Sequence, residues 1–358
     1  MFLSLIAFIL TMVLVVGIHE AGHALSARFF KVNIRRISIG FGKALLSWKD
    51  QTKREWVWGL WPLGGYAQLL NSRIETLPSS DFRHCFDKKP IWQRCIILIS
   101  GSLANFITAF LALFLLYLLG YQQHTPLIKD LRPQTIAAEA GLQANDRFLA
   151  IDNQPTNSWQ EVGMSLIMAL GKSKVPIQVS NQEGRVRTIN LDLSKWHYQN
   201  KERSLFLSLG LNIADAKSSK VTVPGQSFFF ALSSALAKLL FLLKFFFIMI
   251  KQLVNQHLPF AILLGPFGMI ETTIVSFSQG LTVFLYFIAS FSLAVGLVNL
   301  FPFPGLDGGS IAYALIEKFR GKPISLALEI LLHRLAFILF FILLFQLVLN
   351  DIQRYLSS

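Results

Sequence analysis

The chain has 358 residues, of which 53% are hydrophobic and only 15% are charged. Soluble proteins carry about 25% charged residues because polar side chains have to cover their core, so this composition argues against a single water-soluble domain. In a chain this apolar, the formal net charge of +13 favours loops that lie on anionic lipid over the binding of nucleic acid. Cys85 and Cys95 are too few for a disulfide scaffold and are expected to be reduced, cytoplasmic thiols.

Four apolar runs are long enough to cross a bilayer as helices. The first, residues 2–18, holds no charged residue and would extend about 26 Å at a rise of about 1.5 Å per residue. We expect it to be retained as a span rather than removed as a signal peptide, because no basic segment precedes it and no small-residue cleavage site follows it. The other predicted spans are residues 95–119, 281–303 and 326–349.

A fifth apolar run, residues 227–250, contains Lys238 and Lys244. Charged side chains are costly inside a bilayer, whereas a helix that lies in the membrane interface keeps them in water. The periodicity of the run is compatible with both placements, so it predicts either a span or an interfacial helix.

Basic residues near the ends of spans indicate the sidedness of the chain, because they stay on the cytoplasmic face. Residues 28–95 contain 13 basic and 5 acidic residues, whereas residues 121–227 contain 12 and 9. Four basic residues follow the first span closely: Arg28, Lys31, Arg35 and Arg36. The first loop is therefore predicted to be cytoplasmic, and the N-terminus and the second loop are predicted to lie outside.

Both loops show strand-like alternation of apolar and polar residues. In the first loop, residues 33–46 and 55–70 combine this alternation with closely spaced glycines and predict β-hairpins. The second loop, from residue 124 to residue 215, has the composition of one small soluble domain, of about 90 residues. Its predicted strands and helix are residues 147–151, 175–180 and 186–193 around a helical segment at residues 159–170.

The first span ends in His19-Glu20-Ala21-Gly22-His23. Two imidazoles four residues apart lie on one face of a helix and can bind the same metal ion, and Glu20 stands beside them to take a proton from bound water. Ionisable groups at membrane depth are costly unless they are paired or bound to metal, so this position favours a functional site. The alternative is a helix end whose histidines lie among lipid headgroups.

A catalytic zinc site takes three protein ligands and leaves one position for water. The remaining histidines lie in predicted loops or flanks: His84, His124, His197, His257 and His333. Asp307 instead follows the third span in a stretch rich in proline and glycine, residues 299–309, that cannot continue as a helix. A broken helix at membrane depth can place a side chain in a cavity, which makes Asp307 the candidate third ligand. The alternative is a simple Asp-Gly-Gly turn at the membrane surface.

The motif at residues 19–23, together with Asn-Leu-Phe-Pro-Phe-Pro-Gly-Leu-Asp-Gly-Gly at residues 299–309, resembles the site-2 protease family of intramembrane zinc metalloproteases, peptidase family M50. The similarity is closest to the bacterial regulator-of-sigma-E branch, which cuts anti-sigma factors. Residues 37–70 resemble the membrane-re-entrant β-sheet of the family, residues 101–105 its second-span motif, and residues 265–268 the motif before its third span. Ser102 stands where the second-span motif usually has proline.

The resemblance implies that three residues hold Zn²⁺, namely His19, His23 and Asp307. Glu20 would then act as general base on the zinc-bound water. Asn299 is expected to hydrogen-bond the extended backbone of a substrate. The same motifs imply three further substrate-binding positions: Gly64, Gly65 and Pro302.

Residues 137–147 and 151–155 resemble the PDZ domains of bacterial membrane and periplasmic proteases, with Ala144-Asn145-Asp146 in place of the usual Pro-Gly-Asp. Relatives in this branch carry two tandem PDZ domains, whereas the second loop has room for one. A PDZ groove accepts an added strand and often a peptide C-terminus. In this family the domain implies a steric filter that excludes bulky, uncut substrates.

The shared ligand site constrains the topology. His23 and Asp307 must meet at one membrane depth, so the first and third predicted spans must both run inward. A spanning segment at residues 227–250 would reverse the third span. This segment is therefore predicted to lie in the outer interface or to be re-entrant.

The predicted fold is a polytopic α-helical membrane protein with four transmembrane helices, a membrane-associated β-hairpin sheet and an inserted soluble PDZ (α+β) domain. Along the chain, the predicted parts are a first transmembrane helix with the metal motif (1–27), a cytoplasmic or re-entrant β region (28–94), a second transmembrane helix (95–120), a PDZ domain (124–215), interfacial amphipathic helices (223–270), a third transmembrane helix (281–309) and a fourth (326–350).

The predicted function is the hydrolysis of peptide bonds within single-span membrane proteins by a zinc metalloprotease of the bacterial inner membrane. Its expected partners are anti-sigma-factor-like proteins or remnant signal peptides, peptide C-termini at the PDZ domain, and the lipid bilayer, with no nucleic acid. Two other classes of function remain. A PDZ-bearing membrane scaffold would not need Glu20, and a metal transporter would need further intramembrane carboxylates or histidines.

Overall fold

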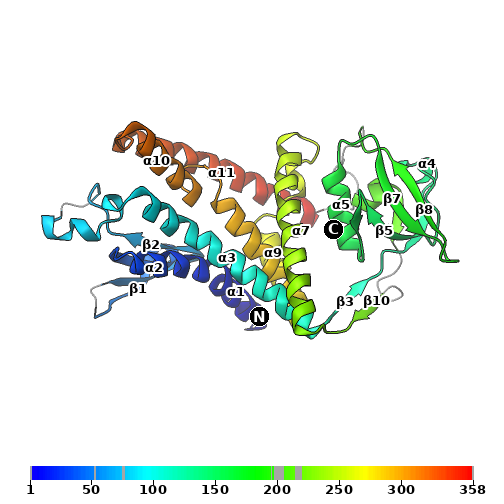
Figure 1. Ribbon diagram of the computed structural model, residues 1–358, viewed down its shortest axis with the longest axis horizontal. Helices are drawn as coiled ribbons and strands as arrows, with labels where there is room; N and C mark the ends of the chain where they lie inside the picture. Colours follow the sequence, from blue (N-terminus) through cyan, green and yellow to red (C-terminus); the bar gives the residue numbers. More distant parts are fainter. Residues whose placement is uncertain are drawn as a thin grey trace. The chain divides into compact units, whose positions relative to one another are not determined.

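The computed structural model describes residues 2–51, 54–74, 77–194, 196, 205–213 and 220–356. It contains two compact units. The membrane unit joins the residues up to Leu115 with those from Gly265 onward, and the inserted unit comprises Leu116–Leu264. Figure 1 shows the long helices of the membrane unit and the sheet of the inserted unit.

Six helices in the described part of the chain are long and apolar enough to cross a membrane. The four predicted spans coincide with four of them, and the other two are Phe228–Val254 and Phe260–Ser278. The chain is therefore a polytopic membrane protein, as its composition predicts. The four matching segments are α1 (Phe2–Met12) with α2 (Ile18–Phe29), which a π-helical turn at Val13–Gly17 joins, α3 (Ile91–Leu119), α9 (Leu281–Asn299) and α11 (Leu326–Leu356).

The first loop forms a β-sheet, as the alternation of its residues predicts. Strand β1 (Ile34–Lys49) is followed by β2 (Glu55–Leu69), and β1 extends beyond the predicted hairpin segment. Several large apolar side chains of the sheet are exposed, among them Leu46, Trp48 and Trp58. An exposed apolar surface of this kind is typical of contact with a membrane or another protein.

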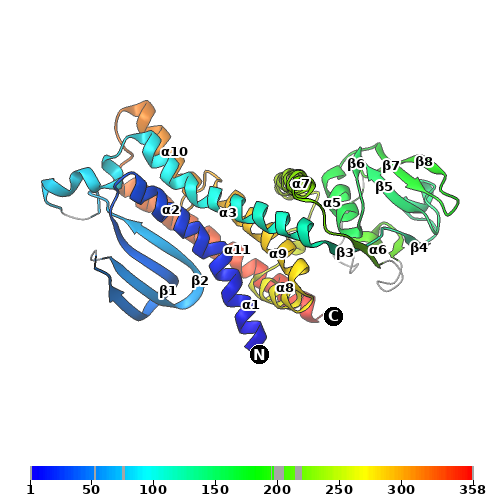
Figure 2. The same cartoon turned by 60° about the horizontal axis from the view of Figure 1, so that its bottom comes forward.

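The two strands bend so that β1 has partners on both of its sides. Ile37 faces Ala67 near the end of β2 and also Trp56 near its start. Gly40 and Gly42 lie at the bend with φ of 88°, a left-handed conformation that glycine adopts without strain. The last residues of β2 consequently form one edge of the sheet, and Figure 2 shows the sheet alongside α2.

The third predicted span breaks at its Pro-Gly stretch, as expected, but the break starts earlier than expected. Helix α9 ends at Asn299, and an unpredicted helix, α10 (Asp307–Arg320), follows it. Gly308 makes the tight return possible, because a Cβ at this position would lie 2.2 Å from the carbonyl oxygen of Leu300. Asp307 is thereby the first residue of α10 rather than the end of the preceding span.

Helix α8 (Pro266–Ser278) begins within the motif at residues 265–268. The backbone N–H groups of Gly265 and Gly268 donate to the carboxylate of Asp351 on α11 at 2.9 and 3.0 Å. The start of a helix leaves such donors without partners, so the buried Asp351 caps α8 from a neighbouring helix. The glycine at 265 is required because a Cβ there would lie 2.4 Å from the carbonyl oxygen of Leu347.

The inserted unit contains a four-stranded antiparallel sheet, in the order β6-β5-β7-β8, with helix α5 beside it (Figure 1). The predicted strands and helix are present within two residues at each end. The bounds are β5 (Arg147–Ile151), β6 (Gln154–Pro155), α5 (Trp159–Ala169), β7 (Val175–Ser180) and β8 (Val186–Leu191). Shorter elements complete the unit: α4 (Ile136–Glu139), α6 (Leu205–Ser208), and β4 (Ile128–Leu131) paired with β9 (Leu211–Ile213).

A two-stranded ribbon connects the inserted sheet domain to the helices on either side of it in sequence. Strand β3 (Tyr121–His124), which follows α3, pairs with β10 (Lys220–Val223), which precedes α7 (Phe228–Val254). The ribbon starts at Gly120, whose φ of 75° ends α3.

Helix α7 packs along α5 within the inserted unit. The ammonium group of Lys238 lies 2.6 Å from the carboxylate of Glu161 on α5. Further along α7, the amide of Gln252 donates to the carbonyl of Leu170 at 3.1 Å, and Leu253 joins the core of the sheet domain. Lys238, one of the two lysines that raise the question of an interfacial helix, is thus paired with helix α5.

Candidate metal centre

His19 and His23 lie one turn apart on α2, directly after the π-helical turn at Val13–Gly17. Such turns are rare and occur frequently at functional sites, where they shift the faces that side chains occupy. Both histidines are buried, and their Nε2 atoms are 3.2 Å apart. The helix therefore presents both imidazoles on one face, as their spacing in the sequence predicts.

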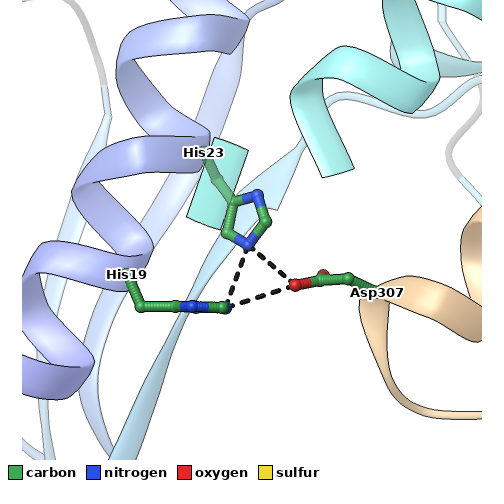
Figure 3. A group of neighbouring side chains, drawn as sticks. All are labelled: His19, His23 and Asp307. Atoms are coloured by element: carbon green, nitrogen blue, oxygen red, sulfur yellow. Dashed lines mark hydrogen bonds and ion pairs between the residues drawn. The ribbon is translucent and has the colours of Figure 1, made fainter. Parts of the chain in front are cut away.

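Asp307 reaches the same point from the start of α10 (Figure 3). Its Oδ2 atom lies 3.2 Å from Nε2 of His19 and 3.2 Å from Nε2 of His23. Within the residues that the structure describes, this is the one group of three His, Cys, Asp or Glu side chains whose ligand atoms converge.

The spacing of these three atoms fits zinc. Protein-bound zinc is tetrahedral with bonds of about 2.0–2.2 Å, so two of its ligand atoms are separated by about 3.3 Å or slightly more. Contacts of 3.2 Å between all three atoms outline one face of such a tetrahedron. In the described structure the buried Oδ2 of Asp307 accepts no hydrogen bond, as expected of an atom that faces a cation.

Helix α3 orients the two imidazoles. Nδ1 of His23 donates to the carbonyl of Ile97 at 2.7 Å, so the neutral ring carries its lone pair on Nε2, the atom that faces Asp307. Gly101 allows the ring to lie there, because a Cβ at this position would come within 2.2 Å of His23 Nε2. The side-chain amide of Asn105 lies 3.3 Å from Nδ1 of His19.

Glu20 faces the edge of the β-sheet. Its Oε2 atom accepts a hydrogen bond from the backbone N–H of Ala67 at 2.9 Å. Gly65 of β2 lies next to Glu20, and it is required by the pairing with β1, because a Cβ there would lie 2.6 Å from the carbonyl oxygen of Ser38. The carboxylate next to the metal ligands is therefore held by strand β2.

A cavity of about 480 Å³ opens onto these groups. Its walls come from α2, α3, the edge of β2 and the end of α9. The site consequently combines two imidazoles, two carboxylates and an adjoining strand edge around one cavity.

Comparison with known proteins agrees with this chemistry. A model of peptidase family M50 matches residues 7–343. The chain belongs to peptidase family M50. Similar proteins include the regulator of sigma E protease of Haemophilus influenzae (28% identical, covering 98% of this chain and 99% of that protein) and the regulator of sigma-E protease RseP of Escherichia coli (26%, 98% and 98%). A third is the putative zinc metalloprotease of Vibrio cholerae (24%, 98% and 98%).

This M50 chain is therefore a metalloprotease that uses zinc, as the two motifs predict. The relatives agree with the site-2 protease branch that the resemblance indicates. The scaffold and transporter alternatives are wrong, because the family and the named relatives are proteases.

The predicted substrate-binding residues of the M50 chain are not all in one place. Gly65 and Asn299 line the cavity, and the amide of Asn299 donates to the carbonyl of Val295 at 3.1 Å. Pro302 is exposed in the turn after α9 and is not part of the cavity wall. Gly64 lies in β2, but its surroundings fall outside the described residues.

Three residues of the M50 site were not predicted individually: Ile97, Ala67 and Asn105. Ile97 and Ala67 act through backbone groups, and the side chains of such residues give no signal. Asn105 does give a signal in the sequence, because an amide inside an apolar span is costly unless it has a partner. Its position in the motif at residues 101–105 was noted, but its contact with His19 depends on how α2 and α3 pack.

Proposed function

We propose that this M50 protease hydrolyses peptide bonds within the membrane-spanning segments of single-span proteins. One observation carries the proposal: its metal ligands come from a helix of membrane-spanning length and from the break that follows another such helix. A protease for water-exposed loops has no need to place its ligands among apolar helices, where ionisable groups are costly.

His19, His23 and Asp307 are the zinc ligands in this proposal. Zinc held there supplies a Lewis acid that polarises the scissile carbonyl and lowers the pKa of a coordinated water toward about 7. Both imidazoles bind as neutral rings, so zinc with these three ligands would carry a net charge of +1 and would favour an anion in the transition state.

Glu20 is the residue that accepts and delivers the proton of the attacking water in this proposal. The N–H of Ala67 donates to Oε2 of Glu20 at 2.9 Å, which leaves Oε1 as the oxygen that can exchange a proton. We assign to Oε1 the acceptance of a proton from the attacking water and its delivery to the leaving amine. The strand therefore positions the base as well as the substrate.

The edge of β2 is suited to hold an unwound substrate. A transmembrane helix hides its carbonyl groups in hydrogen bonds from residue i to residue i−4, so it must be extended before it can be cut. An extended segment can pair with the backbone of a free strand edge, and Gly65 and Ala67 of this edge line the cavity. Asn299, which lines the same cavity from the end of α9, offers an amide for the substrate backbone.

We place the metal centre near the cytoplasmic side of the bacterial inner membrane, with four spans and with the inserted unit outside. The charge of the first loop and the meeting of His23 with Asp307 support this arrangement. Helix α7 then lies in the outer interface, which its ion pair from Lys238 to the sheet domain favours.

The alternative topology is that both α7 and the segment Phe260–Ser278 span the membrane, because two added spans also leave α9 running inward. A reporter of sidedness fused at Asn255, between the two segments, separates these arrangements. We expect Asn255 to lie outside, and a cytoplasmic reporter contradicts the four-span topology.

We assign to the sheet domain of the inserted unit the role of a single PDZ domain that filters substrates by size and binds peptide C-termini. The alignment with the Haemophilus influenzae protein extends over 443 positions, 85 more than the length of this chain. The difference is about the size of one small domain and supports one PDZ domain in place of two.

The test of the protease function is Glu20→Gln, which removes the base but keeps an acceptor for the N–H of Ala67. Glu271→Gln, at an exposed position on α8, is the matched control. We expect short membrane-spanning fragments, from anti-sigma-factor-like proteins or remnant signal peptides, to accumulate in membranes with Glu20→Gln alone. Identical fragment profiles for the unsubstituted protein, Glu20→Gln and Glu271→Gln, at equal zinc content, would contradict the proposal.

A further inference from the structure

One face of α3 lies against both histidines of α2. Ile97, Gly101 and Asn105 are spaced by four residues, so they form a single row along the helix. The first two serve His23, through the carbonyl that accepts its Nδ1–H and through the space in which its ring lies. Asn105 is the third member of the row and contacts His19.

The contact between Asn105 and His19 determines which ring nitrogen of His19 carries the proton. Nδ2 of Asn105 is the amide atom that lies 3.3 Å from Nδ1 of His19. If this amide N–H donates to Nδ1, the single proton of the neutral imidazole sits on Nε2. Nε2 is the atom that faces Asp307 and His23, and a protonated Nε2 has no lone pair for a metal.

Nε2 of His19 keeps its lone pair if the oxygen end of the Asn105 amide, rather than the nitrogen end, faces the ring. Oδ1 of Asn105 is buried and has no hydrogen-bond partner in the described structure. The oxygen and nitrogen ends of an amide are nearly equal in size, so the chemistry of their partners decides which end faces the ring. With Oδ1 toward His19, the amide accepts a hydrogen bond from Nδ1–H, and the lone pair of the ring moves to Nε2.

We propose that Asn105 is a positioning residue of the zinc centre, whose amide oxygen accepts the Nδ1–H of His19 in the metal-bound protein. Asn105 then does for His19 what the carbonyl of Ile97 does for His23. Such partners fix the tautomer and the orientation of a ligating imidazole, and their loss typically weakens metal binding by about 10- to 100-fold.

The packing of α9 holds Asn105 in place for this role. The hydroxyl of Ser292 donates to the backbone carbonyl of Asn105 at 3.0 Å, and Asn105 is fully buried. Gly296 brings α9 close, because a Cβ there would lie 3.1 Å from Cβ of Asn105. The side chain therefore cannot turn to solvent, and a position of this kind is costly for an amide without a partner.

The test compares two substitutions with opposite hydrogen-bonding capacity in the purified, full-length protein. Asn105→Asp keeps an acceptor and removes the donor, whereas Asn105→Leu has a similar volume and removes both. Ser102→Ala, at a buried α3 hydroxyl without a hydrogen-bond partner in the described residues, is the matched control. The readouts are the affinity for Zn²⁺, by competition with a chromophoric chelator, and the visible spectrum of the Co²⁺-loaded protein.

We expect Asn105→Leu to weaken Zn²⁺ binding by about 10- to 100-fold and to alter the Co²⁺ spectrum. Asn105→Asp and Ser102→Ala should bind Zn²⁺ at least as tightly as the unsubstituted protein. Wild-type affinity in Asn105→Leu overturns the proposal, and so does equal weakening in Asn105→Leu and Asn105→Asp.

A second measurement needs no substitution and covers the case in which Asn105→Leu does not fold. In Zn²⁺-loaded protein labelled with ¹⁵N-histidine, the Nδ1 of His19 should carry the proton and Nε2 should show the shift of a metal-bound nitrogen. A proton on Nε2 overturns the proposal. The inference rests on the proposed zinc ligands, and a failure of those ligands is recognised separately, because the unsubstituted protein would then bind no Zn²⁺.

Discussion

Helix α10 carries two partly buried carboxylates that have opposite kinds of partner. Asp307, in its first turn, lies 3.2 Å from Nε2 of His19 and from Nε2 of His23, two imidazoles that bind a metal ion as neutral rings. Glu317, further along the helix, lies 2.8 Å from the guanidinium of Arg94 on α3. The second cluster pairs one positive with one negative charge within the protein. In the first cluster, once its imidazoles are neutral as metal ligands, the negative charge of Asp307 is balanced only by a bound cation.

The two clusters differ in function. The Asp307 cluster can hold a metal ion, whereas the ion pair between Arg94 and Glu317, here called the clamp, joins two helices. Arg94 is buried and packs over the ring of Phe86, so its pair with Glu317 joins α10 to α3 with no outside component. Asp307 joins α10 to α2 through atoms that attract a cation rather than each other. Two clusters of similar burial therefore have different roles, and the state of charge distinguishes them.

The largest predicted difference between the Asp307 and Glu317 clusters is in metal binding. Asp307→Asn replaces the charged ligand by a neutral amide and should weaken Zn²⁺ binding by at least about 100-fold, beyond what the loss of an outer partner causes. Glu317→Gln, the same chemical change on the same helix, should leave the affinity unchanged. Chelator competition on the two purified proteins measures both values.

Unchanged affinity for Zn²⁺ in both Asp307→Asn and Glu317→Gln would remove the distinction between the two clusters. A loss of affinity in both variants would show that the ion pair also controls where Asp307 lies.

The second prediction concerns the space beside His23. Gly101→Ala places a Cβ within 2.2 Å of the Nε2 atom of His23, so the ring must leave the position in which its Nε2 lies 3.2 Å from Asp307. We expect weaker Zn²⁺ binding, by about 10- to 100-fold, with α3 still helical because alanine favours helix over glycine. Gly17→Ala is the control, since its added Cβ would meet no atom closer than 3.9 Å. Unchanged binding in Gly101→Ala would mean that the ring has room that the structure does not show.

The residues that carry the chemistry could be predicted where the sequence itself fixes their geometry. His19 and His23 share a helix face at any packing, because their spacing matches one helical turn. Asp307 could be proposed as their partner from the Pro-Gly break before it and from the resemblance of that segment to the M50 family. The distance between Asp307 and the histidines required the three-dimensional arrangement of α2 and α10.

Other features depend on packing and were missed or only partly predicted. A surface turn was one of the two interpretations of Asp307-Gly308-Gly309, yet this segment starts α10. The chain can return so tightly because Gly308 has no Cβ to collide with the carbonyl oxygen of Leu300, a contact that the sequence does not indicate. The sheet was predicted as simple hairpins, but the bend at Gly40 and Gly42 gives β1 partners on both sides. Strand β7 of the inserted unit was predicted with its correct bounds, because alternate side chains are buried and the alternation in the sequence is clear.

The smallest predicted effect is on stability and tests the clamp directly. Glu317→Gln leaves the charge of the buried Arg94 without its anionic partner. Because Glu317 itself is only partly buried, we expect the free energy of unfolding to fall by about 1–3 kcal/mol, between the values for exposed and fully buried pairs. Replacing both residues, as Arg94→Met with Glu317→Met, should restore most of the loss, because apolar side chains of similar volume need no partner. Thermal unfolding of the metal-free proteins in detergent measures the three values. If the double substitution is as unstable as Glu317→Gln alone, the pair holds α10 by its hydrogen-bond geometry, and the electrostatic account of the clamp is wrong.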